Sequence, residues 1–105
     1  MVERRRNEAG QVAILIAPGY GAGWYTWHYE DDLLWDAQVV DMVLAGASAA
    51  DIVAYCEKTY GSDHYYGGAT DLVVEWVDPG REFRIDEYDG AETLIYRDQY
   101  GWMVV

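Results

Sequence analysis

The spacing of apolar residues changes along the chain, and in the first third it predicts strands. Residues 11–17 are rich in aliphatic side chains and lie between a glycine and a proline. A short apolar stretch with those boundaries is typical of a buried strand. Residues 18–32 keep no clean period, but Tyr25, Trp27 and Tyr29 alternate with polar residues, which predicts a second, short strand.

The middle third predicts two amphipathic helices. Asp36 is a good N-cap residue for the first helix, and Gly46 is a typical stop signal. Ser48 begins the second helix, with Asp51 three residues later as a relaxed capping box and Gly61 as the C-cap. The predicted buried stripes are Val39, Val40, Val43 and Leu44 in the first helix, and Ile52, Val53, Cys56 and Tyr60 in the second.

The last third alternates as strands do. A strand over residues 72–77 ends at the turn Asp-Pro-Gly-Arg, and a strand over 82–88 ends at Asp89-Gly90, a type I′ hairpin signal. A last short strand is predicted over 102–105, which could pair within the chain or with another copy of it, as in a homodimer. The hairpin turn predicts that Tyr88 faces Ala91, Ile85 faces Leu94, Phe83 faces Tyr96 and Glu82 faces Arg97.

This register predicts which hairpin face is buried. We expect the apolar pairs to share one buried face. Glu87 falls opposite Glu92, and two like charges in that position are tolerated only if they are exposed.

The order of these elements predicts the fold class. Strands and helices are grouped rather than alternating, which favours an α+β fold: an antiparallel β-sheet of three to five strands with two helices packed on one face. The length of 105 residues indicates a single domain over residues 1–105, in which residues 1–9 form a flexible polar N-terminus.

The charge of the chain narrows the choice of partners. The net charge is −12, and beyond residue 8 there are 17 acidic against four basic residues. Such a surface repels nucleic acid and anionic lipid but attracts a basic protein, so we expect a basic host protein as partner, with no direct nucleic acid or membrane contact. The single cysteine and the absence of a signal-peptide pattern or a long apolar run favour a cytoplasmic location.

Three glycines after the first strand resemble a nucleotide-binding loop only superficially. Gly19, Gly21 and Gly23 have the spacing G-x-G-x-G, and no helix start or lysine follows them. A Rossmann or Walker loop needs these features to bind phosphate. We therefore predict no cofactor, and interpret the glycines as positions where bulky neighbours approach the backbone closely.

The aromatic residues that follow leave two interpretations open. Trp24, Tyr25 and Trp27 could form a stacking platform or an interface, or they could close the open end of the core. Closing the core is favoured, because a small domain rich in Trp must bury these side chains. We retain Trp24, Tyr25, Trp27 and His28 as candidate binding residues.

The sequence gives little evidence for a catalytic or metal-binding site. His28 lies near Asp31 and Asp32, and His64 follows Asp63, but neither histidine belongs to a metal-ligand spacing. The cysteine lies on a predicted buried stripe, where a thiol is usually inert. We assign no catalytic residue and no metal ligand, and favour a non-enzymatic protein.

Acidic residues gather on the last strands. Glu82 and Asp86 alternate with the core-facing Phe83 and Ile85, and Glu87 lies beside them. For any one residue a solvated face is the simpler interpretation, but the charge of the whole chain exceeds that need. Glu82, Asp86 and Glu87 are therefore candidate contacts to a basic protein.

Two segments together resemble a known group. "GYGAGWYTW" near the start and "FRIDEYDGAE" near the end resemble a family of small acidic bacteriophage and prophage proteins without an assigned activity. The resemblance implies a phage accessory protein inside a bacterial host cell, and it transfers no residue roles.

Two hypotheses follow for the function. The first is a non-enzymatic acidic protein-binding module that modulates or inhibits a basic host protein, one that handles nucleic acid or acts in defence. The second is a small-ligand-binding protein or enzyme that uses residues 19–29, His28 and nearby carboxylates. A deep pocket at residues 19–29 would favour the second, and an exposed acidic face would favour the first.

Overall fold

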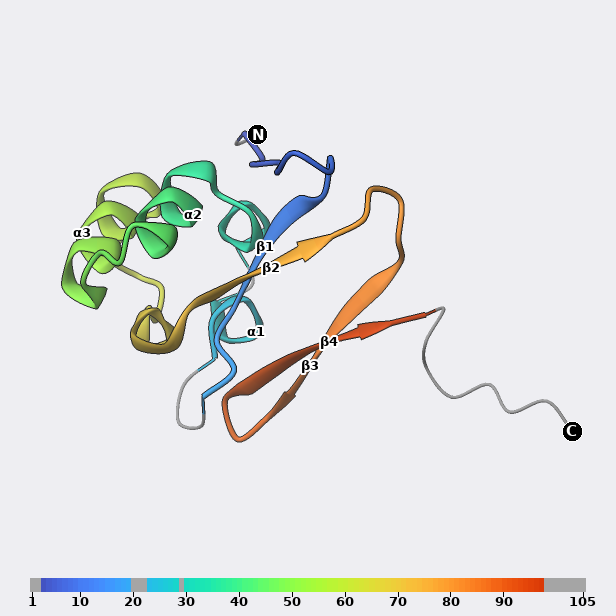
Figure 1. Ribbon diagram of the computed structural model, residues 1–105. Coiled ribbons are helices and arrows are strands. Elements are labelled where there is room, and N and C mark those ends of the chain that lie inside the picture. The colour runs from blue at the N-terminus through green and yellow to red at the C-terminus, as the bar shows by residue number, and fades with distance from the viewer. Residues whose placement is uncertain (1–2, 20–22, 29, 98–105) are drawn as a thin grey trace, which may run out of the picture.

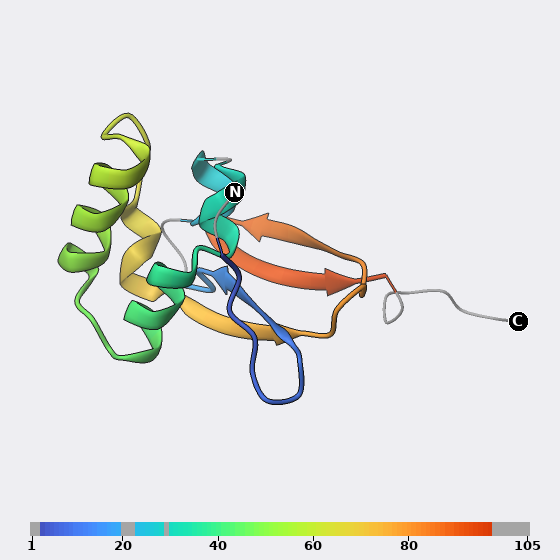
Figure 2. The same ribbon diagram turned by 90° about the horizontal axis from the view of Figure 1, so that it is seen from above.

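The chain folds into three layers, with a two-stranded sheet in the middle (Figures 1 and 2). The computed structural model describes residues 3–19, 23–28 and 30–97. In the middle layer, β1 (Val12–Ile16) pairs with β2 (Val73–Val77). The helical layer contains α2 (Ala37–Leu44) and α3 (Ala49–Tyr60). The hairpin layer contains β3 (Phe83–Tyr88) and β4 (Ala91–Tyr96). The short elements are α1 (Tyr25–His28) and the 3₁₀ helices η1 (Asp31–Leu34) and η2 (Gly67–Asp71).

β1 is buried on both faces, which explains its uninterrupted apolar sequence. Ala13 and Leu15 pack in the core cluster that includes α2 and α3. Ile14 and Ile16 pack on the other side, in the cluster that includes Leu94 of the hairpin. Successive residues of a strand point to opposite faces, so a strand between two layers needs apolar residues at every position. The predicted buried strand is confirmed.

The α+β class with antiparallel strands is confirmed, but the prediction of one sheet with three to five strands is wrong. The described residues form two separate two-stranded sheets. The amide of Glu92 donates to the carbonyl of Ala17 at 2.9 Å where the sheets meet, and β1 and β4 then diverge (Figure 1). The hairpin covers the face of Ile14 and Ile16 instead of extending the edge of β1. An alternating pattern shows that a strand has a buried face, but it does not show whether another strand meets that face or its edge.

Both predicted helices begin where their caps indicated. The Asp36 carboxylate accepts a hydrogen bond from the Val39 amide at 3.0 Å, and the Ser48 hydroxyl accepts one from the Asp51 amide at 3.2 Å. The predicted stripe of α2 is wrong at its last residue, because Leu44 is exposed. Leu44 is the last residue of α2.

The hairpin has the predicted register, and its turn has the expected geometry. Asp89 and Gly90 both have positive φ, 52° and 86°, as a type I′ turn requires. The expectation that all its apolar pairs share one face is wrong at Tyr88, which is 77% exposed. Phe83 and Ile85 face the core cluster, and Tyr88 is an odd number of residues away from both, so it lies on the outer face.

The facing pair Glu87 and Glu92 is present, but the prediction that both are exposed is wrong. Glu92 is only 1% exposed. Its carboxylate accepts hydrogen bonds from the Ala17 amide at 2.9 Å and from the amide and hydroxyl of Thr26 at 2.8 and 2.7 Å. Because these donors replace water, the core can hold the carboxylate.

The segment around Tyr25 is a short helix, so the prediction of a strand there is wrong. α1 is four residues long, and the Trp27 amide donates to the Trp24 carbonyl at 3.2 Å. Tertiary contacts, above all those between Thr26 and Glu92, override the alternating aromatic pattern. Tyr29 and the strand predicted over residues 102–105 lie outside the described residues.

The polar segment before β1 contacts the rest of the fold. The Arg5 carbonyl accepts a hydrogen bond from the Ala13 amide at 2.9 Å, and the Glu3 carbonyl accepts one from the Ala37 amide at 3.1 Å. The Arg5 guanidinium donates twice to the Asp41 carboxylate and holds the pKa of that group below its ordinary value. Whether residues 1–9 are flexible in solution stays a prediction.

Candidate functional site

Two segments rich in glycine and aromatic residues meet at one end of the core. A Cβ atom at Gly68 would overlap the backbone oxygen of Gly23, so the two segments of the backbone touch there without side chains between them. The rings of Trp24 and Tyr66 lie 6.0 Å apart between centroids, and Trp24 is 0% exposed. The Trp24 indole donates to the Leu33 carbonyl at 2.9 Å. Trp24 is thus a core residue, as the favoured interpretation predicted.

Trp27 and Tyr65 form an exposed aromatic pair beside this contact. Their exposed fractions are 40% and 55%, and their ring centroids lie 5.4 Å apart at an interplanar angle of 33°. Trp27 comes from α1 and Tyr65 from the loop after α3. Segments that are distant in the sequence therefore build one exposed aromatic surface.

Polar groups lie on the same two segments. The His64 imidazole Nε2 is 3.7 Å from a Glu30 carboxylate oxygen, and its ring meets that of Tyr66 edge to face. The half-buried Tyr25 donates its hydroxyl hydrogen to Asp31 at 3.1 Å. His28 belongs to α1, but its side chain lies outside the described part of the structure.

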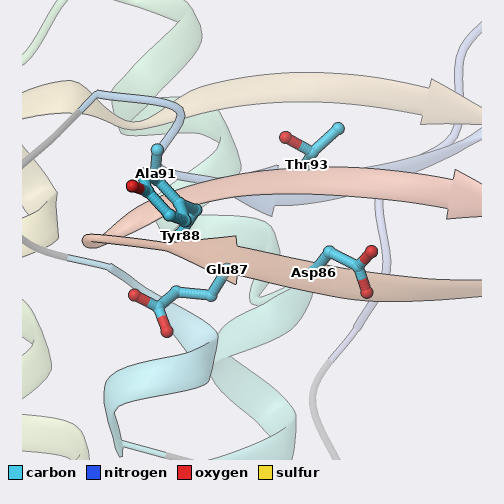
Figure 3. A pocket seen from close by; sticks show the side chains of 5 residues that line it. All are labelled: Asp86, Glu87, Tyr88, Ala91 and Thr93. Carbon is cyan, nitrogen blue, oxygen red and sulfur yellow. The ribbon is translucent and has the colours of Figure 1, made fainter.

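The turn end of the hairpin carries a second surface feature. A hollow of about 370 Å³ lies near the β3–β4 turn, and Figure 3 shows the side chains around it. Both strands contribute to its lining: Asp86, Glu87, Tyr88, Ala91 and Thr93. An exposed aromatic ring and two carboxylates thus lie together at the turn end of the hairpin.

The three acidic candidates on the hairpin have different surroundings. Glu82 forms an ion pair with Arg97 at 2.7 Å, and Asp86 forms one with Arg84 at 3.2 Å. Glu87 accepts a hydrogen bond from the Gly90 amide at 2.6 Å. All three carboxylates are exposed.

Buried hydroxyl and thiol groups serve structure in this fold. The Asp36 carboxylate that caps α2 also accepts hydrogen bonds from the hydroxyls of Tyr55 and Tyr60 on α3. Burial raises the pKa of the Cys56 thiol to about 12, so it stays protonated and unreactive near neutral pH. Among the residues that the structure describes, no group of three or more His, Cys, Asp or Glu side chains is placed to hold a metal ion.

Four of the seven predicted binding residues lie exposed, at two places on the surface, whereas Trp24 is buried in the core and the prediction that it binds a partner is wrong. Trp27 lies in the exposed aromatic pair, and Glu82, Asp86 and Glu87 lie on the hairpin. Sequence reasoning missed Tyr65 and Tyr88. The glycines after Tyr65 repeat the glycine and aromatic composition of residues 19–27, and the even spacing of Tyr88 from the polar Asp86 is a signal that could have put it on the outer face.

The comparisons with known proteins give no family for the chain. No family model matches it, and no curated protein or solved structure matches it either. In the described parts of the chain, no helix is long and apolar enough to cross a membrane.

Proposed function

We propose that this chain is a non-enzymatic protein-binding module that binds a basic surface of another protein at the turn end of its β3–β4 hairpin. The observation that carries the proposal is Tyr88, a large aromatic side chain that is 77% exposed beside the hollow lined by Asp86 and Glu87. Tyrosine is enriched in protein interfaces because its ring buries apolar area while its hydroxyl hydrogen-bonds. The adjacent carboxylates select lysine and arginine side chains of the partner.

The charge of the whole chain supports the same class of partner. A net charge of −12 speeds the encounter with a basic protein and opposes binding to nucleic acid. The sequence resemblance to small acidic phage proteins supports a basic host protein that handles nucleic acid or acts in defence, inhibited or modulated inside a bacterial cell. A ligand or enzyme site at residues 19–29 has less support, because Trp24 lies in the core.

Charge reversal on the hairpin tests the proposal. The variant Asp86→Lys with Glu87→Lys is compared with Glu8→Lys combined with Glu57→Lys, which changes the net charge equally at exposed positions elsewhere. Proteins captured from a bacterial lysate by the wild type are then titrated directly against each purified variant. We expect at least tenfold weaker binding of a basic partner for the hairpin variant, little change for the control, and weaker binding of the wild type at high salt.

Tyr88→Ser gives a second measurement that leaves the charge unchanged. We expect it to weaken the same interaction while circular dichroism shows an intact fold. Equal loss of binding in the hairpin variant and in the control would mean that net charge alone acts, and it would overturn the proposed site.

A further inference from the structure

We propose that the exposed pair Trp27 and Tyr65 is a second binding site, one that takes an arginine or lysine side chain of a protein partner. The pair lies apart from the hollow of the hairpin and belongs to different elements. That the cation comes from a protein rests on the proposed function. The affinity of the pair for a cationic side chain does not, and can be measured alone.

Two glycines accommodate these exposed rings. A Cβ atom at Gly23 would lie 2.5 Å from Cδ1 of Trp27, and one at Gly67 would lie 2.6 Å from Cζ of Tyr65. Real Cβ atoms do not approach other atoms that closely, so each ring occupies space that only a glycine leaves free.

The glycine beneath Tyr65 has no conformational reason to be there. Gly67 does not adopt the left-handed φ that favours glycine, unlike Gly61 and Gly80. Glycine in a helical turn costs about 0.5–1 kcal/mol relative to alanine. An exposed ring contributes little to the core in return, so a role for the ring at the surface accounts better for this glycine.

The formal charges around the pair favour a cationic ligand. The segments that carry the pair, residues 23–35 and 61–72, contain no lysine or arginine. Their acidic residues are Glu30, Asp31, Asp32, Asp63 and Asp71. The negative field and the electron-rich ring faces attract the same ligand, a cation, and a planar guanidinium can also stack on an aromatic ring.

The aromatic pair also lies near the turn end of the hairpin. Thr26, the neighbour of Trp27 in α1, donates two hydrogen bonds to Glu92, which faces Glu87 across the hairpin. Figures 1 and 2 both show α1 beside the turn end of the β3–β4 hairpin. The two surfaces therefore lie near the same end of the hairpin, with Tyr88 on its outer face and α1 bonded to Glu92 on its inner face.

The test follows the indole N–H signal of Trp27 by NMR, assigned with the variant Trp27→Phe. The probe is N-acetyl-arginine methylamide, and its matched control is the citrulline analogue, which has nearly the same shape without the charge. At equal ionic strength we expect the arginine probe to shift the Trp27 signal saturably, and the citrulline probe to shift it several-fold less.

Two variants locate the effect. Tyr65→Ser is expected to weaken binding of the arginine probe about two- to fivefold, the usual size of an exposed cation–π contact. Gly67→Ala displaces the flexible Tyr65 ring and is expected to weaken probe binding in the same direction, while the unfolding midpoint does not fall. Equal shifts by both probes, or undiminished binding to Tyr65→Ser, would overturn the inference.

Tyr88→Ser separates this inference from the proposed function. It removes the exposed ring of the hairpin, so the Trp27 shift should persist. If the arginine probe binds but charge reversal on the hairpin leaves partner binding unchanged, the proposed function is wrong and the second site stands. If charge reversal abolishes partner binding but the arginine probe does not shift the Trp27 signal, the second site is wrong and the proposed function stands.

Discussion

Glu92 shows how one side chain can join three parts of a fold. Its carboxylate accepts hydrogen bonds from Ala17 after β1 and from Thr26 in α1, while Glu92 itself is the second residue of β4. A buried carboxylate is costly unless donors replace its water, and here backbone amides supply two of the bonds. At the level of single residues, this contact fixes the position of the hairpin relative to α1.

Replacement of Glu92 should therefore be strongly destabilising. Glu92→Ala leaves the amide of Ala17 and the amide and hydroxyl of Thr26 without their acceptor, and we expect a loss of about 2–4 kcal/mol in the free energy of unfolding. Urea denaturation followed by circular dichroism measures the change. Glu82→Ala, an exposed position in the same hairpin, should leave the value nearly unchanged. Similar values for the two variants would show that the Glu92 bonds contribute little.

The sequence could not reveal Glu92, although it revealed the strand that carries it. The hairpin pattern placed Glu92 opposite Glu87 correctly, and chemistry alone suggested that two carboxylates need water. The donors that stabilise Glu92 come from residues 17 and 26, far away in the chain. Such a pairing has no local signal, whereas the caps at Asp36 and Ser48 act within three residues and were predicted.

At the scale of elements, the hairpin depends on its turn. Asp89 and Gly90 both adopt left-handed backbone conformations, which suit the right-handed twist of the flanking strands. The hairpin carries the proposed basic-partner surface at this turn, so the turn geometry sets the positions of Tyr88 and Ala91.

A β-branched residue in the turn should destabilise the hairpin. Gly90→Val forces a left-handed φ on a residue that avoids it, and we expect the free energy of unfolding to fall by about 1–2 kcal/mol. Asp89→Asn is the matched control, because asparagine tolerates this conformation and should be nearly neutral. Equal stability of Gly90→Val and the wild type in urea would contradict the assigned turn.

The elements also show where sequence reasoning ends. Strands and helices with strong local patterns, such as residues 11–17 and the two capped helices, were predictable. The short helix α1 and the division into two sheets depend on which surfaces meet in three dimensions. For the site, Trp27 was a candidate from its own segment, but Tyr65 could be joined to it only by the fold.

At the scale of the whole molecule, buried hydroxyl and thiol groups link stability to alkaline pH. Burial raises the pKa of Tyr55, Tyr66 and Tyr96 from 10.0 to about 12, and that of Cys56 from 9.0 to about 12. The folded state therefore holds protons that the unfolded state releases first. The stability from these groups is fully present below about pH 9 and is lost as pH rises toward 12.

We expect the free energy of unfolding to decrease progressively between about pH 9 and pH 12. Urea titrations at several pH values measure this slope, and tyrosinate absorbance reports the ionisation directly. Tyr96→Phe removes one of the groups and should make the decrease shallower. A free energy of unfolding that does not change with pH across this window would contradict the raised pKa values.

The pairing of β1 with β2 has a consequence for the order of events during synthesis. β1 is synthesised before its partner β2, which follows about 60 residues later, and the hairpin that covers its other face comes later still. While those residues are being made, the apolar strand β1 therefore has neither partner. Non-local pairing of this kind slows folding and lengthens the exposure of apolar segments. Exposed apolar strands of this kind are typical targets of chaperones, so we expect the nascent chain to present β1 before the acidic surface of the folded protein has formed.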